Sequence, residues 1–590
     1  MSQRQCANTQ GVSLQVAWQD IPWQKVHRHV FRLQKRIYRA TQRRDVRTVH
    51  KLQKLLVKSW YARLLAVRRI TQDNRGKHTA GIDGAKSLTP PQRWRLAITL
   101  QLDGNATALR RLWIPKRGST TDKRPLGMPT QTDRARQTLV RQALEAAWEA
   151  KLSPHTYGFR PGRSCHDAIG AIFTAIRYRP QYALKLDIAK CFDTIDHQAL
   201  LAKVQAPPMM RRQLKAWLQA GILEEDVLSP TTAGTPQGGS CSPLLALIAL
   251  QGMEEAITQG YPHARVIAYA DDGVVLHENR QTLKHCQELL QTWLAGIGLR
   301  LNEAKSHIGH TLEGDHPGCA FLGCDIRQYR VGKHQSGKGP RGHRRLGYTT
   351  LIKPATANVK DHLATLGRII DRGKALPQGL LLRQRNPTIW GWATYYRHVV
   401  SQAIYHRLDH LTWVKLRHWA RWRHPRKSTA WALRRYWHRR GARQTFATSA
   451  TDPNAEHLRA HSQVAITRHV KVQGNRSPYD GDWMYWSTRQ GRHPNVSARL
   501  ARLLKAQRGR GRFCGLFFHH DDRIEVDHRN GTHRDARLAN LQALHGHCHD
   551  AKTRENRDYL PPGLRDKHHD TEERRERKPS CAVLEQRQAE

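Results

Sequence analysis

The sequence predicts a multidomain α+β protein, and three observations support this fold class. The chain has 590 residues, which is too long for a single hydrophobic core. Between about residues 86 and 335, short apolar strands alternate with amphipathic helices. After about residue 345 the pattern becomes helical and dense in tryptophan, arginine and histidine. We therefore expect several domains of different class along one chain.

The charge of the chain indicates a polyanionic partner. Lys and Arg number 99 against 48 Asp and Glu, a net charge of +51, and the excess is spread along most of the length. Phosphate backbones screen such a charge, so nucleic acid is the expected partner and an acidic membrane surface is the alternative. The longest apolar run, Pro243 to Leu250, is far shorter than the roughly 20 residues that span a bilayer. We therefore expect no membrane association.

Cysteine usage and the first residues indicate a cytoplasmic protein. Ten cysteines are scattered without the spacing of a disulfide framework. The start, MSQRQCANTQ, lacks the charged-then-apolar pattern of a secretion signal. Both features fit a reduced compartment such as the bacterial cytosol or nucleoid.

Composition shifts divide the chain into six segments. The first should hold one or two basic helices over about 24–70, and a Gly/Lys/Arg-rich linker is expected near 331–345. The last has too little apolar content to fold alone. The segments are an N-terminal extension (1–85), an α+β domain (86–335), a helical domain (345–440), a mixed basic region (441–505), a compact His/Cys/Asp-rich module (508–556) and a tail (557–590).

The run RVIAYADDGVVL places Asp271 and Asp272 at the turn of a predicted β-hairpin, because apolar residues flank them on both sides. Adjacent carboxylates there repel each other unless a cation neutralises them. Hard oxygen ligands of this kind hold Mg²⁺ over a phosphoryl group. The alternative is a solvated turn, in which Asp is common.

A second carboxylate, Asp187, ends the predicted strand of YALKLDIAKCFDTIDH. If this strand neighbours the hairpin in one sheet, Asp187 and Asp271 can converge on two metal ions. Phe192 follows where the strand gives way to a helix. Its ring could exclude a 2′-hydroxyl and so favour deoxynucleotides, or it could simply pack in the core.

Seven motifs in order resemble those of the reverse transcriptases, specifically the group II intron-encoded reverse transcriptase/maturase family. Together they are far more specific than any one alone. They are TAGIDG (79–84), WIPKRGSTTDKRPLGMPT (113–130), YGFRPGRSCHDAI (157–169), GTPQGGSCSPLLALIAL (234–250), YADD (269–272), GLRLNEAKSHIG (298–309) and FLGCDI (321–326).

The resemblance implies a right-hand polymerase, with fingers and palm over 86–335, and a role for each motif. Lys116 and Arg124 would hold the triphosphate of the incoming nucleotide by charge-assisted hydrogen bonds. Gln237 and Gly238 would lie against the nucleotide and its templating base, and Lys305 near the leaving pyrophosphate. Among the acids we expect Asp272 to be an electrostatic or outer contributor, because alternation should turn it away from Asp271.

The helical segment resembles the thumb, or maturase (X), domain of the same family. We expect Trp390, Trp392, Tyr395 and Trp413 to form the core of a helical bundle. Exposed Arg and Lys on the opposite faces would then hold RNA and the primer–template duplex through phosphate contacts. The region over 441–505 resembles the family's DNA-binding segment.

The module over 508–556 resembles an HNH endonuclease, a ββα hairpin and helix around one metal ion. In that family His528 would be the general base, since a histidine of ordinary pKa about 6.5 suits the role. Asp527 and His549 would ligate Mg²⁺ or a similar ion, and Asn540 would fix the loop that orients His528. The alternative is an incidental histidine-rich patch on a basic protein.

The same module departs from the family at a second metal site. Relatives often carry two Cys-x-x-Cys pairs for Zn²⁺, which prefers four ligands. Here Gly511 stands where the partner of Cys514 would be, and His545 pairs with Cys548. Three ligands remain, so the sequence does not predict a complete zinc site, although His519 or His520 is a candidate for the fourth.

The resemblance implies a protein that binds its group II intron RNA, assists splicing, nicks a DNA target and copies the intron from dNTPs by target-primed reverse transcription. Two alternatives remain: a non-catalytic RNA-binding maturase, and a bacterial reverse transcriptase with another role such as defence. The cofactors implied are two Mg²⁺ ions in the polymerase and one similar ion in the HNH module.

Overall fold

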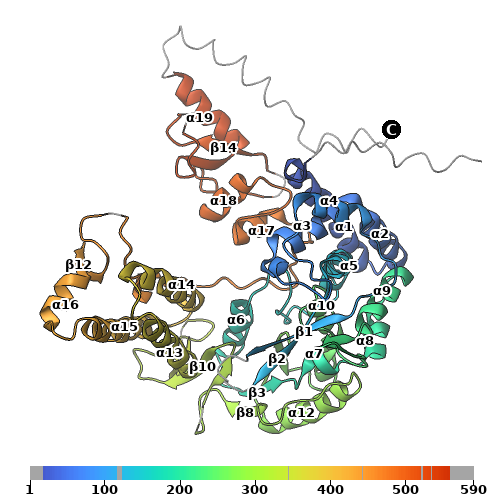
Figure 1. The fold of residues 1–590 in the computed structure, drawn as a ribbon, viewed down its shortest axis with the longest axis horizontal. Coiled ribbons are helices and arrows are strands. Elements are labelled where there is room, and N and C mark those ends of the chain that lie inside the picture. The colour runs from blue at the N-terminus through green and yellow to red at the C-terminus, as the bar shows by residue number, and fades with distance from the viewer. Residues whose placement is uncertain are drawn as a thin grey trace, which may run out of the picture. The chain divides into compact units, whose positions relative to one another are not determined.

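The fold is taken from a computed structural model, which describes residues 17–558 apart from 116–121, 316, 343, 442, 453, 520–521 and 533–534. The chain forms two compact units, Met1–Ser477 and Pro478–Glu590, and each is described by itself. Lys116, His520 and nearly all of the predicted tail therefore lie outside the described residues. Figure 1 shows the order of the elements along the chain.

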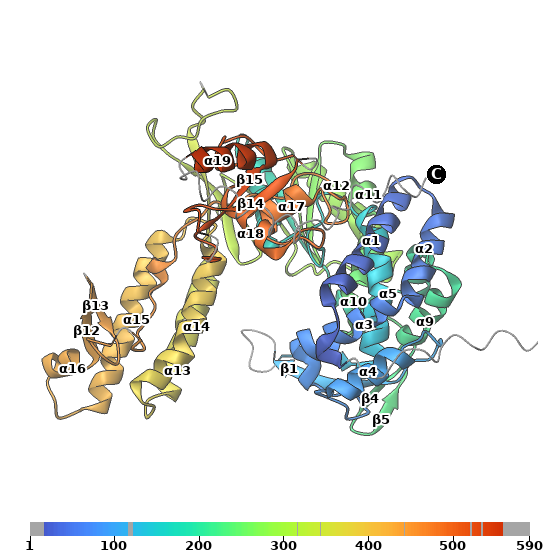
Figure 2. The same ribbon diagram turned by 90° about the horizontal axis from the view of Figure 1, so that it is seen from above.

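The first unit begins with three helices where the sequence suggested one or two. They are α1 (Trp23–Gln42), α2 (Val46–Lys58) and α3 (Trp60–Arg68), followed by a π-helical turn (Arg69–Asp73). The chain breaks after α1 because Arg44 adopts a left-handed φ of 59° and Asp45 caps α2, accepting from the Thr48 amide at 3.0 Å. Helices α1, α2 and α3 pack on α5 (Gln131–Glu149), as Figure 2 shows.

A four-stranded sheet of order β2-β1-β4-β5 follows these helices. Its strands are β1 (Leu109–Pro115), β2 (Lys123–Met128), β4 (Ile222–Glu224) and β5 (Val227–Ser229). Strands β1 and β2 are antiparallel, with Ile114 opposite Arg124. Helix α4 (Pro90–Thr99) precedes the sheet and packs on α3. Trp113, Ile114 and Pro115 of the WIPKRG motif therefore end β1, and Arg124 lies on β2.

A second four-stranded sheet of order β6-β7-β3-β8 forms the centre of the unit. Its strands are β3 (Tyr182–Asp187), β6 (Arg265–Tyr269), β7 (Asp272–His277) and β8 (His307–His310), all antiparallel to their neighbours. The helices along the chain from Cys165 to Ala295 are α6 (Cys165–Ile176), α7 (Cys191–Thr194), α8 (His197–Val204), α9 (Pro208–Leu218), α10 (Ser242–Leu250), α11 (Met253–Gly260) and α12 (Arg280–Ala295). The predicted apolar run forms α10, which is buried along its length.

A three-stranded sheet of order β11-β10-β9 connects the central sheet to the helical region. Its strands are β9 (Cys319–Phe321), β10 (Cys324–Arg330) and β11 (Tyr348–Pro354). The Gly/Lys/Arg-rich stretch predicted as a linker joins β10 to β11, and Lys338 forms a β-bridge with Arg345. It is thus a connection inside one sheet, because the flanking residues pair with each other.

The helical region is a bundle with a two-stranded ribbon. Its elements are α13 (Thr356–Arg372), α14 (Gln378–Tyr396), α15 (Gln402–Arg423), α16 (Thr429–Tyr436), β12 (Trp437–Arg440) and β13 (Arg443–Phe446). The core contains Leu381, Leu416, Trp419 and Phe446. The prediction that Trp390 lies in this core is wrong.

Trp390 is 41% exposed because α14 buries the face that carries Leu381, Ile389 and Ala393, from which its side chain is rotated. Trp392, Tyr395 and Trp413 are half-buried. Arg459 lies over the exposed Trp390 ring at 5.0 Å from its centroid. The aromatic residues of this region therefore divide between a packed interior and a basic, aromatic surface.

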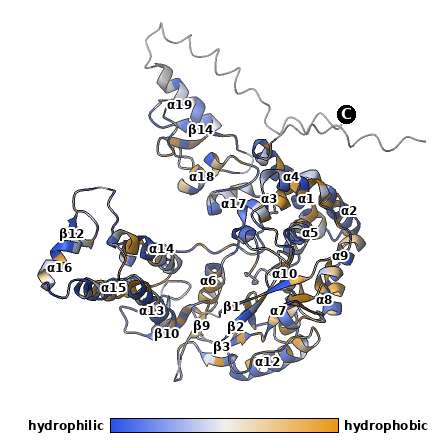
Figure 3. Cartoon of the chain, viewed as in Figure 1, coloured by the Kyte–Doolittle hydropathy of each residue, from blue (hydrophilic) through white to orange (hydrophobic). Residues whose placement is uncertain are grey.

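The second unit is small, and its described residues form three helices and a hairpin. Its elements are α17 (Trp483–Gln490), α18 (Ala498–Ala506), β14 (Ile524–His528), β15 (Leu541–His545) and α19 (Gly546–Asp558). Its core contains Met484, Leu503, Leu504 and Leu541. Hydrophilic residues occur on the elements of both units, as the blue of Figure 3 shows. Within the described part of the chain, no helix has the length and apolar character that crossing a membrane requires.

Candidate active sites

The predicted hairpin and its neighbouring strand form one carboxylate cluster. Strands β6 and β7 are antiparallel, and their turn contains Ala270, at a left-handed φ of 57°, and Asp271. Strand β3 lies beside β7 with Asp187 directly opposite Asp272. Opposite residues of an antiparallel pair project from the same face of a sheet. The prediction that these two strands are neighbours in one sheet is confirmed.

The electrostatics of this cluster favour a bound cation. Burial, together with the charge of Asp187, raises the pKa of Asp271, while Arg124 and Lys305 act in the opposite direction. Burial and the charges of Asp271 and Asp187 raise the pKa of Asp272 to about 6. Three repelling, partly desolvated carboxylates supply the hard oxygen donors that Mg²⁺ prefers, so the residues present fit such an ion.

The expectation that Asp272 is an electrostatic or outer contributor stays a prediction, but the strand alternation that suggested it does not hold. Alternation between Asp271 and Asp272 does not apply because Asp271 lies in the turn and only Asp272 lies in β7. The pairing with Asp187 instead turns Asp272 toward the shared face. Asp187 and Asp272 therefore both lie where their carboxylates can ligate a metal ion.

Two basic residues expected at the nucleotide lie close to the carboxylates. Lys305 Nζ is 3.7 Å from Asp187 Oδ2, and the lysine side chain is 64% exposed. Arg124 is exposed on β2 and lowers the pKa of Asp271 through its charge. Both can therefore act on an anion that approaches the cluster from solvent.

The Gln237–Gly238 segment is held against β2. The Gln237 carbonyl accepts from the Gly127 amide at 2.9 Å, and its side-chain amide donates to Asp193 Oδ1 at 3.0 Å. Gly238 has a φ of 126°, and a Cβ there would lie 2.8 Å from the Gly127 oxygen. The backbone therefore requires glycine at this position.

Phe192 lies on the short helix α7, directly after the strand that ends at Asp187. The side chain is half-buried, and its ring meets that of Phe159 edge-on at 6.1 Å. Its carbonyl accepts from the Thr235 amide at 2.6 Å, which connects α7 to the Gln237 segment. Both the gate and the packing interpretations fit this position.

A residue without a role in the sequence analysis supports the hairpin turn. A Cβ on Gly158 would lie 2.3 Å from the Ala270 amide nitrogen, so the YGF loop can approach the turn only with glycine there. The Tyr157 amide also donates to the Ala268 carbonyl at 2.9 Å. The signal was present as the YGFRPG motif, but its contact with the turn is long-range and is not encoded locally.

The second unit holds the other predicted site on β14, β15 and α19. Asp527 and His528 end β14, Asn540 precedes β15, and His549 lies in the first turn of α19. Asn540 Oδ1 accepts from the Asn530 amide at 3.2 Å, and the Asn540 side chain donates to the Asp535 carbonyl at 2.9 Å. Asn540 thus ties the loop that follows His528.

Asp527 and His549 lie close together, with His549 Nε2 4.0 Å from Asp527 Oδ1. Three neighbours of this pair were not predicted from the sequence. Glu525 contacts His549, while Gln542 and Lys552 bond to Asp527. Their roles are not evident from the sequence alone, because each is an ordinary polar residue whose partner lies on another element.

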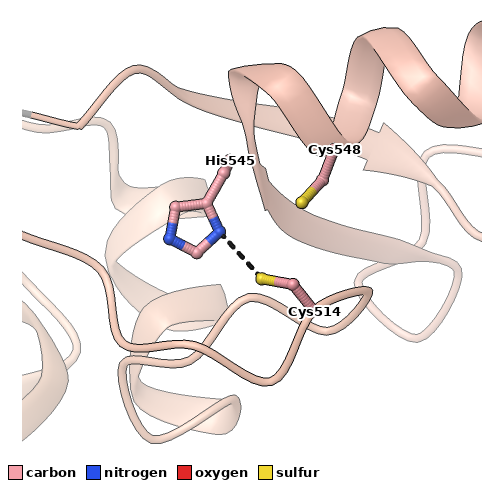
Figure 4. A group of neighbouring side chains, drawn as sticks. All are labelled: Cys514, His545 and Cys548. Atoms are coloured by element: carbon pink, nitrogen blue, oxygen red, sulfur yellow. Dashed lines mark hydrogen bonds between the residues drawn. The ribbon is translucent and has the colours of Figure 1, made fainter.

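Cys514, His545 and Cys548 also come together (Figure 4), and Cys514 Sγ is 3.3 Å from His545 Nδ1. Within the described ranges, this is the one set of at least three His, Cys, Asp or Glu ligand atoms that all lie within 4.8 Å of one another. Asp187, Asp271 and Asp272 do not reach that spacing. Burial and the neighbouring Cys514 raise the pKa of Cys548.

Gly511 lies beside this cluster, where the sequence comparison expected a fourth ligand. A Cβ on Gly511 would lie 3.1 Å from Cys514 Sγ and 2.6 Å from His545 Nδ1. The thiol and imidazole set fits Zn²⁺, but glycine supplies no ligand where a fourth would be needed. The three-ligand prediction agrees with this arrangement.

Three known families match successive parts of the chain. The N-terminal domain of reverse transcriptase matches residues 18–100, reverse transcriptase (RNA-dependent DNA polymerase) matches 114–326, and the group II intron maturase-specific domain matches 359–437. The central match contains the β6–β7 hairpin and Asp187. The chain therefore contains a reverse transcriptase domain followed by a group II intron maturase domain.

Among individual relatives, the chain is homologous to the group II intron-encoded protein LtrA of Lactococcus lactis, with 36% identity over 196 residues, 32% of each chain. Protein YkfC of Escherichia coli is 28% identical over 302 residues, covering 42% of this chain and 77% of YkfC. The match to LtrA thus spans about a third of that relative. A structure of apo telomerase from Candida tropicalis, truncated from its C-terminal domain, overlaps 38% of this chain and 53% of that chain at a TM-score of 0.31 and 16% identity.

Proposed function

We propose that the first unit copies RNA into DNA, with Asp187, Asp271 and Asp272 holding two Mg²⁺ ions. The observation that carries this proposal is the register of β3 and β7, which places Asp187 opposite Asp272 beside the turn that holds Asp271. The ions would supply charge stabilisation for attacking and leaving oxygens. The chain's own contribution is to hold these carboxylates on one face of a rigid sheet.

The nucleotide would be bound by groups around this cluster. Arg124 and Lys305 would pair with its phosphate oxygens, and the same role is proposed for Lys116, which lies outside the described residues. Gln237 and Gly238 would line the position of the base pair, because their segment is fixed to β2. Phe192 would lie at the sugar and exclude a 2′-hydroxyl.

The RNA partner is proposed to be a group II intron. The maturase-specific match and the likeness to LtrA support binding of intron RNA and assistance to splicing. The net charge of +51 supports a phosphate-rich partner of considerable size. A DNA target would then receive the copied intron.

The second unit is proposed to be the HNH endonuclease that nicks this DNA target. The ββα order of β14, β15 and α19 supports this function, with His528 as general base and Asp527 and His549 as ligands of Mg²⁺ or a similar ion. Asn540 would keep the loop after His528 in place. The nick would provide the 3′-hydroxyl that the first unit extends.

The proposed zinc site has three protein ligands, one fewer than Zn²⁺ prefers. Cys514, His545 and Cys548 could hold Zn²⁺ only with a fourth ligand from solvent or from His519 or His520, since Gly511 supplies none. Zinc content measured on purified full-length protein tests this: one equivalent that falls in Cys548→Ser supports the site, and none in the wild type excludes it.

Primer extension tests the polymerase against a non-catalytic maturase. With Mg²⁺ and an annealed RNA template, Asp271→Ala should lower extension by about 1,000-fold, because loss of a ligand removes several kcal/mol of charge stabilisation. Asp226→Ala, on the exposed β4–β5 turn, is the matched control and should extend normally. Absence of extension in the wild type, or an Asp271→Ala variant as active as wild type, would reject the enzyme.

A further inference from the structure

Two proposed ligand atoms of the second unit face each other across a gap that suits an ion. His549 Nε2 and Asp527 Oδ1 are 4.0 Å apart. Ligand atoms that each lie about 2.1 Å from one ion on opposite sides are about this far apart. Both side chains are largely shielded from solvent, at 29% and 14% exposure. The position of each atom depends on the groups that contact the rest of its side chain.

The histidine is oriented by Glu525. Glu525 Oε2 lies 2.9 Å from His549 Nδ1. An ionised carboxylate can only accept, so this contact favours the proton on Nδ1 and leaves the Nε2 lone pair toward Asp527. A carboxylate behind a histidine ligand both orients the ring and raises its basicity.

The aspartate is oriented by two further groups. Lys552 Nζ and Gln542 Nε2 both donate to Asp527 Oδ2, each at 2.7 Å. These bonds occupy one oxygen of the carboxylate and leave Oδ1 on the side of His549. Lys552 Nζ also donates to the His528 carbonyl at 2.7 Å, which fixes the end of β14 beside the proposed base.

The fold brings this arrangement together from three elements. Glu525 and Asp527 are two apart on β14 and so share a face of the hairpin. Gln542 is opposite Asp527 in the β14–β15 register. His549 and Lys552 are three apart on α19 and so share a side of that helix.

We propose that Glu525, Gln542 and Lys552 form an outer layer that aims His549 Nε2 and Asp527 Oδ1 at one divalent ion. These three are positioning residues, because they act through the ligands and not on the ion. The proposal rests on the proposed nuclease function. It goes further by assigning a role to three residues that lie in the motif segments but had no role in the sequence analysis.

Binding of Mn²⁺ to the full-length chain, measured by electron paramagnetic resonance, tests the layer without relying on activity. The parent chain would carry Asp187→Asn, Asp271→Asn and Asp272→Asn to remove the three proposed polymerase ligands. Glu525→Leu and Lys552→Met should each weaken Mn²⁺ binding about 10- to 100-fold. Glu525→Gln, whose amide oxygen can still accept from Nδ1, should weaken it less.

Matched variants separate failure of this layer from failure of the nuclease. Asp550→Asn, on the exposed side of α19, should bind Mn²⁺ as tightly as the parent. Made in the parent chain, His528→Ala should bind Mn²⁺ as tightly as the parent, and made in the otherwise wild-type chain it should not nick DNA. Because Glu525 and Lys552 lie in the second unit, a thermal unfolding profile of Glu525→Leu and Lys552→Met that equals the parent's would show that this unit still folds.

Two results would overturn the proposal in different ways. Mn²⁺ binding by Glu525→Leu and Lys552→Met that equals the parent's would reject the layer while leaving the nuclease intact. A parent chain that binds no Mn²⁺ at this site, together with a wild-type chain that nicks no DNA, would reject the nuclease and the layer with it.

Discussion

The aspartates of the central sheet gain from a cation because of their own surroundings. Burial and like charges raise the pKa of Asp272 to about 6, and both effects disfavour its ionised form. Lys305, 3.7 Å from Asp187, offsets the repulsion only in part, since its side chain is mostly exposed to solvent. A divalent ion among these oxygens would remove the repulsion that remains.

Individual residues were predictable where local sequence determines them. Asp271 was recognisable because a pair of acids between apolar runs marks a hairpin turn. Glu525 and Lys552 were not, since their significance depends on contacts with His549 and Asp527 across elements. The contact of Gly158 with the Ala270 backbone is likewise visible only in three dimensions.

Replacing Phe192 distinguishes a sugar gate from a packing residue. Phe192→Val should reduce discrimination against ribonucleotides at least about tenfold, equal to about 1.4 kcal/mol, because the smaller side chain leaves room for a 2′-hydroxyl. Single-nucleotide incorporation with paired ribo- and deoxynucleotides measures this ratio. An unchanged ratio accompanied by lower stability would assign the ring to packing against Phe159.

At the scale of elements, the positions of strands could be predicted from the sequence, whereas the ends of helices and the faces that they expose could not. Strands β3, β6 and β7 were expected because apolar alternation and a turn act locally. The break between α1 and α2 depends on a left-handed residue and one cap, signals that basic helical periodicity hides. Exposure of Trp390 depends on which face of α14 meets the bundle, and tertiary packing decides that.

Helix α15 is joined to the turn at His461–Gln463 by one carboxylate. Asp409 Oδ1 accepts from the His461 amide and from His461 Nδ1, both at 2.7 Å, and Oδ2 accepts from the Ser462 amide at 3.0 Å. Burial raises the pKa of Asp409, but the hydrogen bonds from His461 and Ser462 outweigh it and lower the pKa overall. The folded bundle therefore favours the ionised carboxylate.

Asp409→Asn should lower the free energy of unfolding by about 1.5–3 kcal/mol near neutral pH, the typical contribution of hydrogen bonds to a charged group. Because the folded pKa is below the ordinary 3.8, the stabilisation is complete above that pH and is lost as the pH falls below it. Urea unfolding at pH 7 and at pH 3 should therefore show a difference that shrinks in acid. Asp361→Asn, exposed on α13, should show no such difference at either pH.

At the scale of the whole molecule, charge and division into units shape the function. A net charge of +51 should make nucleic-acid affinity fall steeply with salt, since each phosphate contact releases counterions. The two proposed active sites lie in different units, on β3 and β7 and on β14 and α19. The excess charge was evident in the sequence, whereas the division between Ser477 and Pro478 lies inside the predicted 441–505 region.

Because the two proposed active sites lie in different units, we expect DNA nicking and primer extension to be lost separately. His528→Ala should lower DNA nicking by about 100-fold or more, the usual contribution of a general base, and should leave primer extension on an annealed template unchanged. Asp271→Ala should give the reverse pattern. On a nicked DNA target the His528→Ala chain should extend normally, because the missing 3′-hydroxyl has been supplied. Loss of both activities in either variant would mean that the two sites depend on each other, contrary to the assignment of one complete site to each unit.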